Sequence, residues 1–75
     1  MGTAMIIKDL IKEIRIKCCI SQGKLAEWSG IDQTSLSYYE RGKRKPGLMA
    51  IKKIIDVANE RAGMSIKYTD IRDEE

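Results

Sequence analysis

A group of polar side chains followed by a run of positive charge is the part of the sequence most able to do chemistry. Among the amide and hydroxyl side chains of residues 33–38, which both donate and accept hydrogen bonds, four are expected to face outward: Gln33, Thr34, Ser37 and Tyr38. Four cationic residues then fall within five positions: Arg41, Lys43, Arg44 and Lys45. Such polar groups have the reach to bind the edges of nucleic-acid bases, and cations bind phosphates. A basic run alone is more often a solvated loop, so its role depends on the elements that position it.

The composition argues against an enzyme. The 75 residues are 43% hydrophobic and 33% charged, which fits one small domain over residues 1–75. Histidine is absent, and two cysteines cannot complete a tetrahedral zinc site. The sequence also has no coherent carboxylate pair and no phosphate-cradling glycine loop. We therefore expect no catalytic residue, no metal and no cofactor.

The distribution of charge and apolar residues points to a cytoplasmic protein whose excess of positive charge lies in residues 1–53. No apolar run approaches the roughly 18 residues of a membrane span, and charges interrupt the start of the chain. The net charge is +3, made of a balance of +6 over residues 1–53 and of −3 over residues 54–75. The polar group and the basic run lie in the positive part. We expect a cytoplasmic location without a membrane partner, and reduced cysteines.

Hydrophobic periodicity predicts four helices, over residues 5–18, about 22–29, about 33–41 and about 48–61. The residues expected to face the core are Ile7, Leu10, Ile11, Ile14, Cys18, Leu25, Ala26, Ser29, Leu36, Tyr39, Leu48, Ile51, Ile54, Ile55 and Ala58. Residues 64–68 alternate like a strand but have no obvious partner. The prediction is an all-α fold.

The second and third helices are separated by only three residues. Ser21 and Asp32 are suited to cap their N-termini, and Gly30 is suited to end the second helix. Helices this close must cross steeply, with small residues such as Ala26 where their backbones approach. This is the spacing of a DNA-binding helix-turn-helix. It turns the polar group on the third helix outward, where the basic run follows directly.

These residues carry a resemblance to a known family. The segments Ser21–Ala26, Gly30–Ile31, Ser35–Ser37 and Glu40–Pro46 resemble the Cro/CI-type helix-turn-helix family of phage repressors and xenobiotic-response-element-like regulators. The resemblance covers about residues 10–60 and leaves 64–75 as a C-terminal extension. It implies a compact four- to five-helix bundle of the lambda-repressor-like type.

The resemblance also implies a function and a set of site residues. It implies a sequence-specific regulator of transcription, as a repressor, with the helix at about 33–41 in the major groove of double-stranded DNA and a homodimer on a palindromic operator. The base-contacting residues are then Gln33, Thr34, Ser37 and Tyr38, and the phosphate-contacting residues are Gln22, Arg41, Lys43, Arg44 and Lys45. Gln22 stands at a helix N-terminus, where the partial positive charge favours a phosphate. A family ion pair corresponds to Arg15 and Glu40.

Two departures from the family pattern leave alternatives open. Cys19 replaces the usual glycine after the first helix, and we expect Cys18 and Cys19 to be small apolar residues near the core rather than a disulfide. Trp28 stands where the family is usually polar, and is either an aromatic folded over the first helix or a contact with a protein partner. Residues 64–71 form either a short fifth helix that packs Ile66 and Ile71 on the bundle or a dimer-forming extension. The alternative function is an antitoxin-like protein that binds a toxin and regulates its own operon.

Overall fold

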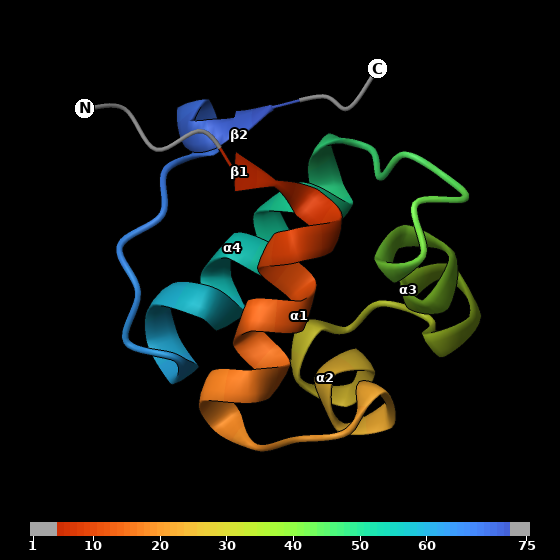
Figure 1. Cartoon of the computed structure of the whole chain (residues 1–75), viewed down its shortest axis with the longest axis horizontal. Helices are drawn as coiled ribbons and strands as arrows, with labels where there is room; N and C mark the ends of the chain where they lie inside the picture. The colour runs from red at the N-terminus through yellow and green to blue at the C-terminus, as the bar shows by residue number, and fades with distance from the viewer. Residues whose placement is uncertain (1–4, 73–75) are drawn as a thin grey trace.

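The computed structural model describes residues 5–72, which form four α-helices and a short pairing between the first and last described segments (Figure 1). In chain order the elements are β1 Met5–Ile6, α1 Ile7–Cys18, α2 Gln22–Ser29, α3 Gln33–Glu40, α4 Leu48–Arg61, the 3₁₀ turn η1 Tyr68–Asp70 and β2 Ile71–Arg72. The all-α prediction is confirmed. The predicted bounds of the second and fourth helices agree with α2 and α4, and Arg41, predicted as the end of the third helix, is the C-cap of α3.

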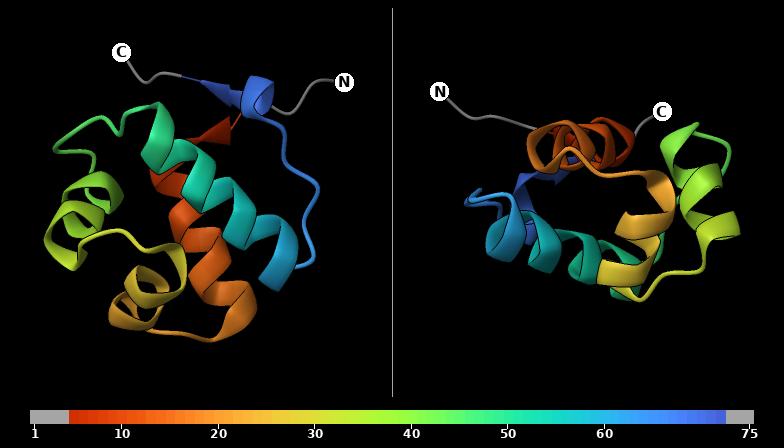
Figure 2. Two further views of the ribbon diagram at one scale, coloured as in Figure 1. Left: turned by 180° about the vertical axis from the view of Figure 1, so that it is seen from behind. Right: turned by 90° about the horizontal axis from the view of Figure 1, so that it is seen from below.

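Every α-helix contributes to one core. The fully buried side chains are Leu10, Ile11 and Ile14 of α1, Leu25 of α2, Leu36 of α3 and Ile54 of α4. Burying each of them contributes about 1.5–3 kcal/mol relative to leaving it in water. In the right-hand view of Figure 2, α1 and α4 lie one above the other and α3 lies at the outer edge. The outward face of α3 is therefore free of other elements of the described chain.

Local hydrogen bonds fix the starts of α2 and α3 and the connection between the two helices. Ser21 and Asp32 each accept a hydrogen bond from the backbone N–H three residues further on, at 3.1 and 3.2 Å, as predicted for N-caps. Gly30 ends α2 with φ of 74°, a left-handed conformation that glycine adopts without strain. The buried hydroxyl of Ser29 accepts from the N–H of Ile31 at 3.2 Å. These contacts set the angle at which α3 leaves α2.

The segment after α4 does not form the fifth α-helix that was one alternative predicted for it, and its role in a dimer stays a prediction. Within the described residues it forms the single turn η1 and then β2, which pairs in parallel with β1, Met5 with Ile71 and Ile6 with Arg72. The side-chain amide of Asn59 holds the segment by donating to the carbonyl of Ile66 at 3.0 Å and accepting from its N–H at 2.8 Å. Ile66 and Ile71 pack against the core, as the fifth-helix alternative expected.

Three individual predictions about burial were wrong or only partly right. Leu48 was predicted to be buried but is 51% exposed, because it is the first residue of α4 and lies beyond the part of the helix that faces α1. Cys19 is exposed, whereas Cys18 packs against the core. Tyr39 is half-buried at the edge of the core.

The first helix begins at Ile7 rather than at residue 5, because Met5–Ile6 pair with β2.

Candidate nucleic-acid interface

The orientation of α3 is set by its inward residues. Leu36 is fully buried, Glu40 is buried, and Tyr39 packs against the core. The 3.6-residue period of the helix therefore turns the opposite side outward. This outward side carries the four residues predicted to contact bases: Gln33, Thr34, Ser37 and Tyr38.

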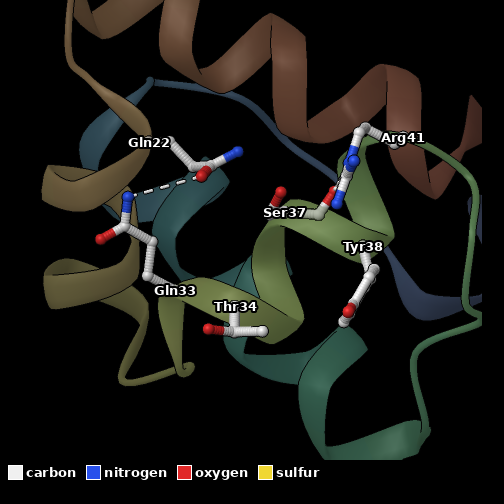
Figure 3. Close-up of a pocket in the computed structure, with 6 residues that line it drawn as sticks. All are labelled: Gln22, Gln33, Thr34, Ser37, Tyr38 and Arg41. Carbon is white, nitrogen blue, oxygen red and sulfur yellow. Dashed lines mark hydrogen bonds between the residues drawn. The ribbon is translucent and has the colours of Figure 1, made fainter.

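These four side chains meet two further predicted site residues around a single open hollow. The hollow has a volume of about 300 Å³ and is lined by Gln22, Gln33, Thr34, Ser37, Tyr38 and Arg41 (Figure 3). Gln22 comes from the first turn of α2, and the others come from α3 and its C-cap. The fold thus gathers amide, hydroxyl and guanidinium groups from two helices onto one concave surface. Such a surface can bind a ligand that presents both hydrogen-bonding edges and negative charge.

Gln22 and Gln33 are linked directly across the hollow. The Nε2 group of Gln33 donates to Oε1 of Gln22 at 3.4 Å, and Figure 3 shows the two amides facing one another. The side chain of Gln33 lies over Gly23, where an added Cβ would stand 3.5 Å from Oε1 of Gln33. That is an ordinary van der Waals distance, so the position of Gln33 does not require a glycine beneath it.

Glu40 lies behind the hollow and joins three helices. Its Oε2 atom accepts from a guanidinium nitrogen of Arg15 in α1 at 2.6 Å, and its Oε1 atom accepts from Nε2 of Gln22 in α2 at 2.9 Å. The Glu40 side chain is only 10% exposed. A buried carboxylate is tolerated when both oxygens have partners, as they do here. Arg15 and Glu40 are therefore in contact, at the positions given by the family resemblance.

The basic run begins where α3 ends. The N–H groups of Gly42 and Lys43 donate to the carbonyls of Tyr39 and Tyr38, and Gly42 has φ of 73°. This pair of hydrogen bonds around a left-handed residue is the Schellman motif, which turns the chain sharply at a helix end. After this turn the connection runs from the end of α3 to α4.

Tyr38 connects the basic run to the hollow. The guanidinium carbons of Arg41 and Arg44 lie 5.4 and 5.2 Å from the centre of its ring, within range of cation–π attraction. Arg41 also donates from Nε to the carbonyl of Ser37 at 3.3 Å. Lys43 and Lys45 are exposed beside these arginines and do not line the hollow.

Three of these contacts were not predicted from the sequence. These are the bond from Gln33 to Gln22, the bond from Gln22 to Glu40, and the stacking of Arg44 on Tyr38. A glutamine as the first residue of both α2 and α3 was the available signal for the first contact, since the N-termini of the two helices face the same side. The other two depend on the crossing of the helices and on the helix end, and no local pattern encodes them.

Trp28 lies at a different place from the hollow and is not a freely exposed aromatic. Its ring packs against the core and is covered by Arg61 of α4, whose guanidinium carbon stands 4.4 Å from the ring centre. The thiol of Cys18 donates to the carbonyl of Arg61 at 3.5 Å, which joins the ends of α1 and α4 beside it.

Within residues 5–72, no helix is long and apolar enough to cross a membrane. No group of three or more potential metal-ligating side chains comes together in the same part of the chain.

Comparison with known proteins gives one match. The family model described as helix-turn-helix matches residues 11–62. The match begins in the second turn of α1 and ends just past the end of α4. The matched region contains the hollow, Glu40 and the basic run. Searches among curated proteins and among solved structures gave no significant match.

Proposed function

This chain belongs to the Cro/CI-type helix-turn-helix family of DNA-binding regulators, and we propose that it is a sequence-specific repressor. In this proposal α3 enters the major groove of double-stranded DNA, and two copies of the chain occupy a palindromic operator. Binding there blocks transcription. Family membership carries the general activity, and the geometry of the hollow supports the particular residues.

The observation that carries the proposal is the gathering of six polar side chains on the outward side of α3 and the start of α2. A major groove is about 12 Å wide and admits one α-helix, whose side chains then face the edges of the bases. In a helix-turn-helix the N-terminal residues of the second helix make those contacts. Gln33 and Thr34 are the first two residues of α3.

Gln33 is the principal base-reading residue in this proposal. Its side chain is exposed and offers one acceptor and two N–H hydrogens, which match N6 and N7 of adenine. Ser37 lies about one helical turn further on and reaches a neighbouring base or phosphate. Thr34 and Tyr38 flank this row and contact bases from either side.

The phosphates are held by a second set of groups around the hollow. Gln22 stands at the N-terminus of α2, where free backbone N–H groups and the helix dipole favour an anion. The cations Arg41, Lys43, Arg44 and Lys45 follow α3 on the same side. Phosphate contacts of this kind position the protein without selecting a sequence.

A protein partner is less well supported. Trp28 and the segment at 64–71 are the two places where we expected such a partner to bind. Trp28 is covered by Arg61, and Ile66 and Ile71 pack against the core. The polar side chains that line the hollow instead lie on the outward side of α3 and at the start of α2.

The test is selection of bound sequences from random duplex DNA, followed by measurements on the Gln33→Ala variant. The substitution should weaken operator binding by about 1–3 kcal/mol, because a two-pronged contact with one base is lost. The loss should disappear on duplexes substituted at that one base pair, and binding to random DNA should be unchanged.

Thr69→Ala is the matched control, since Thr69 is exposed in η1 at the other end of the molecule. It should bind every duplex as the wild type does. An equal loss for Gln33→Ala on all sequences, or no loss at all, would show that Gln33 does not read bases. Failure of the wild-type chain to select any sequence would contradict the proposed function itself.

A further inference from the structure

We infer that the buried Glu40 is a positioning residue that determines which way the amide of Gln33 faces, and thereby the base that α3 prefers. The inference rests on the proposed function, because it concerns how the same site selects its base. It follows from three hydrogen bonds that form a continuous chain from α1 to the outward side of α3.

The chain starts at a group that can only accept. An ionised carboxylate has no hydrogen to donate. Its Oε2 atom is occupied by Arg15 at 2.6 Å, and its Oε1 atom by Gln22 at 2.9 Å. Gln22 must therefore turn its Nε2 group towards Glu40. The Oε1 atom of Gln22 is then the atom that faces Gln33.

The same rule fixes the next amide. Oε1 of Gln22 can only accept, so Gln33 must turn its own Nε2 group towards it, as it does at 3.4 Å. Figure 3 shows Oε1 of Gln33 turned away from Gln22. A reversed Gln33 amide would place two oxygens against one another. The buried carboxylate thus fixes the orientation of the Gln22 amide, and through it the orientation of the Gln33 amide at the surface.

This polarity has a consequence for base selection. The outward Oε1 atom of Gln33 accepts from an exocyclic amino group, and the second Nε2 hydrogen donates to a neighbouring ring nitrogen. Adenine presents this pair as N6 and N7. Guanine presents the acceptor O6 where adenine presents the N6 amino group, so the outward oxygen of Gln33 would repel guanine O6. Glu40 therefore favours adenine over guanine at this position without touching DNA.

The discriminating variant is Glu40→Gln. Its side chain has almost the same size, but an amide can either accept from Gln22 or donate to it. Because Arg15 can only donate, the amide oxygen of this variant faces Arg15 and its NH2 group faces Gln22, so the polarity of the chain is reversed. On duplexes that differ only at the base pair read by Gln33, we expect the preference for adenine over guanine to fall by about tenfold, as for loss of one oriented base contact.

Arg15→Met is the matched control for the lost ion pair. It removes the same contact with Glu40 but leaves the carboxylate as an acceptor for Gln22. Thermal unfolding should show both variants to be destabilised, whereas only Glu40→Gln should lose base preference. An equal loss of preference in both variants would attribute the effect to the ion pair and overturn the inference.

Gln22→Leu keeps the test decisive if Glu40→Gln does not fold, and a double variant tests the direction of the chain. Gln22→Leu breaks the chain while leaving Arg15 and Glu40 paired, and should relax the preference in the same way. The double variant Gln22→Glu with Glu40→Gln should restore it, because the new carboxylate at position 22 again obliges Gln33 to donate. The net charge is unchanged, but the carboxylate now lies at position 22 in the lining of the hollow, which should weaken binding to all DNA equally.

The outcomes separate this inference from the proposed function. Retention of the full adenine preference by both Glu40→Gln and Gln22→Leu, with loss of it in Gln33→Ala, would overturn the role of Glu40 alone. Absence of any base preference in the wild-type chain would overturn the proposed function instead.

Discussion

Cys19 ends α1 in the left-handed region, with φ of 55°. Its N–H donates to the carbonyl of Ile16 and the next N–H to that of Arg15, so Cys19 is the central residue of a Schellman motif. A side chain at this position crowds the backbone, at a cost of roughly 1–2 kcal/mol, which glycine avoids. The thiol is exposed and contributes little to the core.

We predict that Cys19→Gly stabilises the protein. Relief of the strain outweighs the extra backbone entropy of glycine in the unfolded chain, about 0.5–1 kcal/mol, so the net gain is about 0.5–1 kcal/mol. Chemical denaturation measures it as a higher midpoint with an unchanged slope. Cys19→Ala keeps the strained conformation and should show no such gain. A lower midpoint for Cys19→Gly than for Cys19→Ala would contradict this interpretation.

At the residue scale, sequence periodicity was enough to find the outward side of α3. Once Leu36 faces the core, the helical period turns Gln33 and Ser37 outward. The contacts of Glu40 could not be found in this way. Gln22 is 18 residues from Glu40 and Arg15 is 25 residues away, and their meeting depends on how three helices cross.

At the element scale, the basic run is held more firmly than a solvated loop. The Schellman motif at Gly42 turns the chain at the end of α3, and Arg44 stacks on Tyr38 beside the hollow. Lys43 and Lys45 remain exposed next to it. This arrangement presents several cations beside the outward side of α3.

We predict that Lys43→Ala and Arg44→Ala weaken binding to operator and to random DNA alike. Each lost phosphate contact should lower the slope of log affinity against log salt by about one unit, because fewer counterions are released. Titrations at several salt concentrations measure this slope. Lys67→Ala removes one exposed charge away from α3 and is the control. Unchanged slopes in both loop variants would show that the run is only a solvated turn.

The sequence predicted elements with a strong period or a cap, and missed those that depend on distant pairing. The fourth helix was placed correctly at Leu48–Arg61, because its apolar residues repeat at helical spacing over 14 residues. The pairing of Met5–Ile6 with Ile71–Arg72 was missed. Two-residue strands carry no period, and the partners lie at opposite ends of the described chain.

At the scale of the whole molecule, shape decides how two copies can share one operator. The described chain measures 33 × 26 × 19 Å, and α3 lies at its outer edge. In dimeric helix-turn-helix proteins the two half-sites lie about 34–36 Å apart, one turn of DNA. Two copies placed side by side along one face of the duplex can therefore present their α3 helices to successive major grooves.

We predict that two copies bind an operator with two inverted half-sites, and that both must lie on the same face of the DNA. Inserting about five base pairs between the half-sites turns one of them to the opposite face. The second copy then loses its neighbour, and affinity for the full operator should fall by about tenfold or more.

Analytical ultracentrifugation should give two chains per duplex on the original operator. Substituting one half-site at the base pair read by Gln33 should lower affinity as the insertion does, since each copy depends on the other. One chain per duplex, with affinity unaffected by the insertion, would show that the protein binds as a monomer.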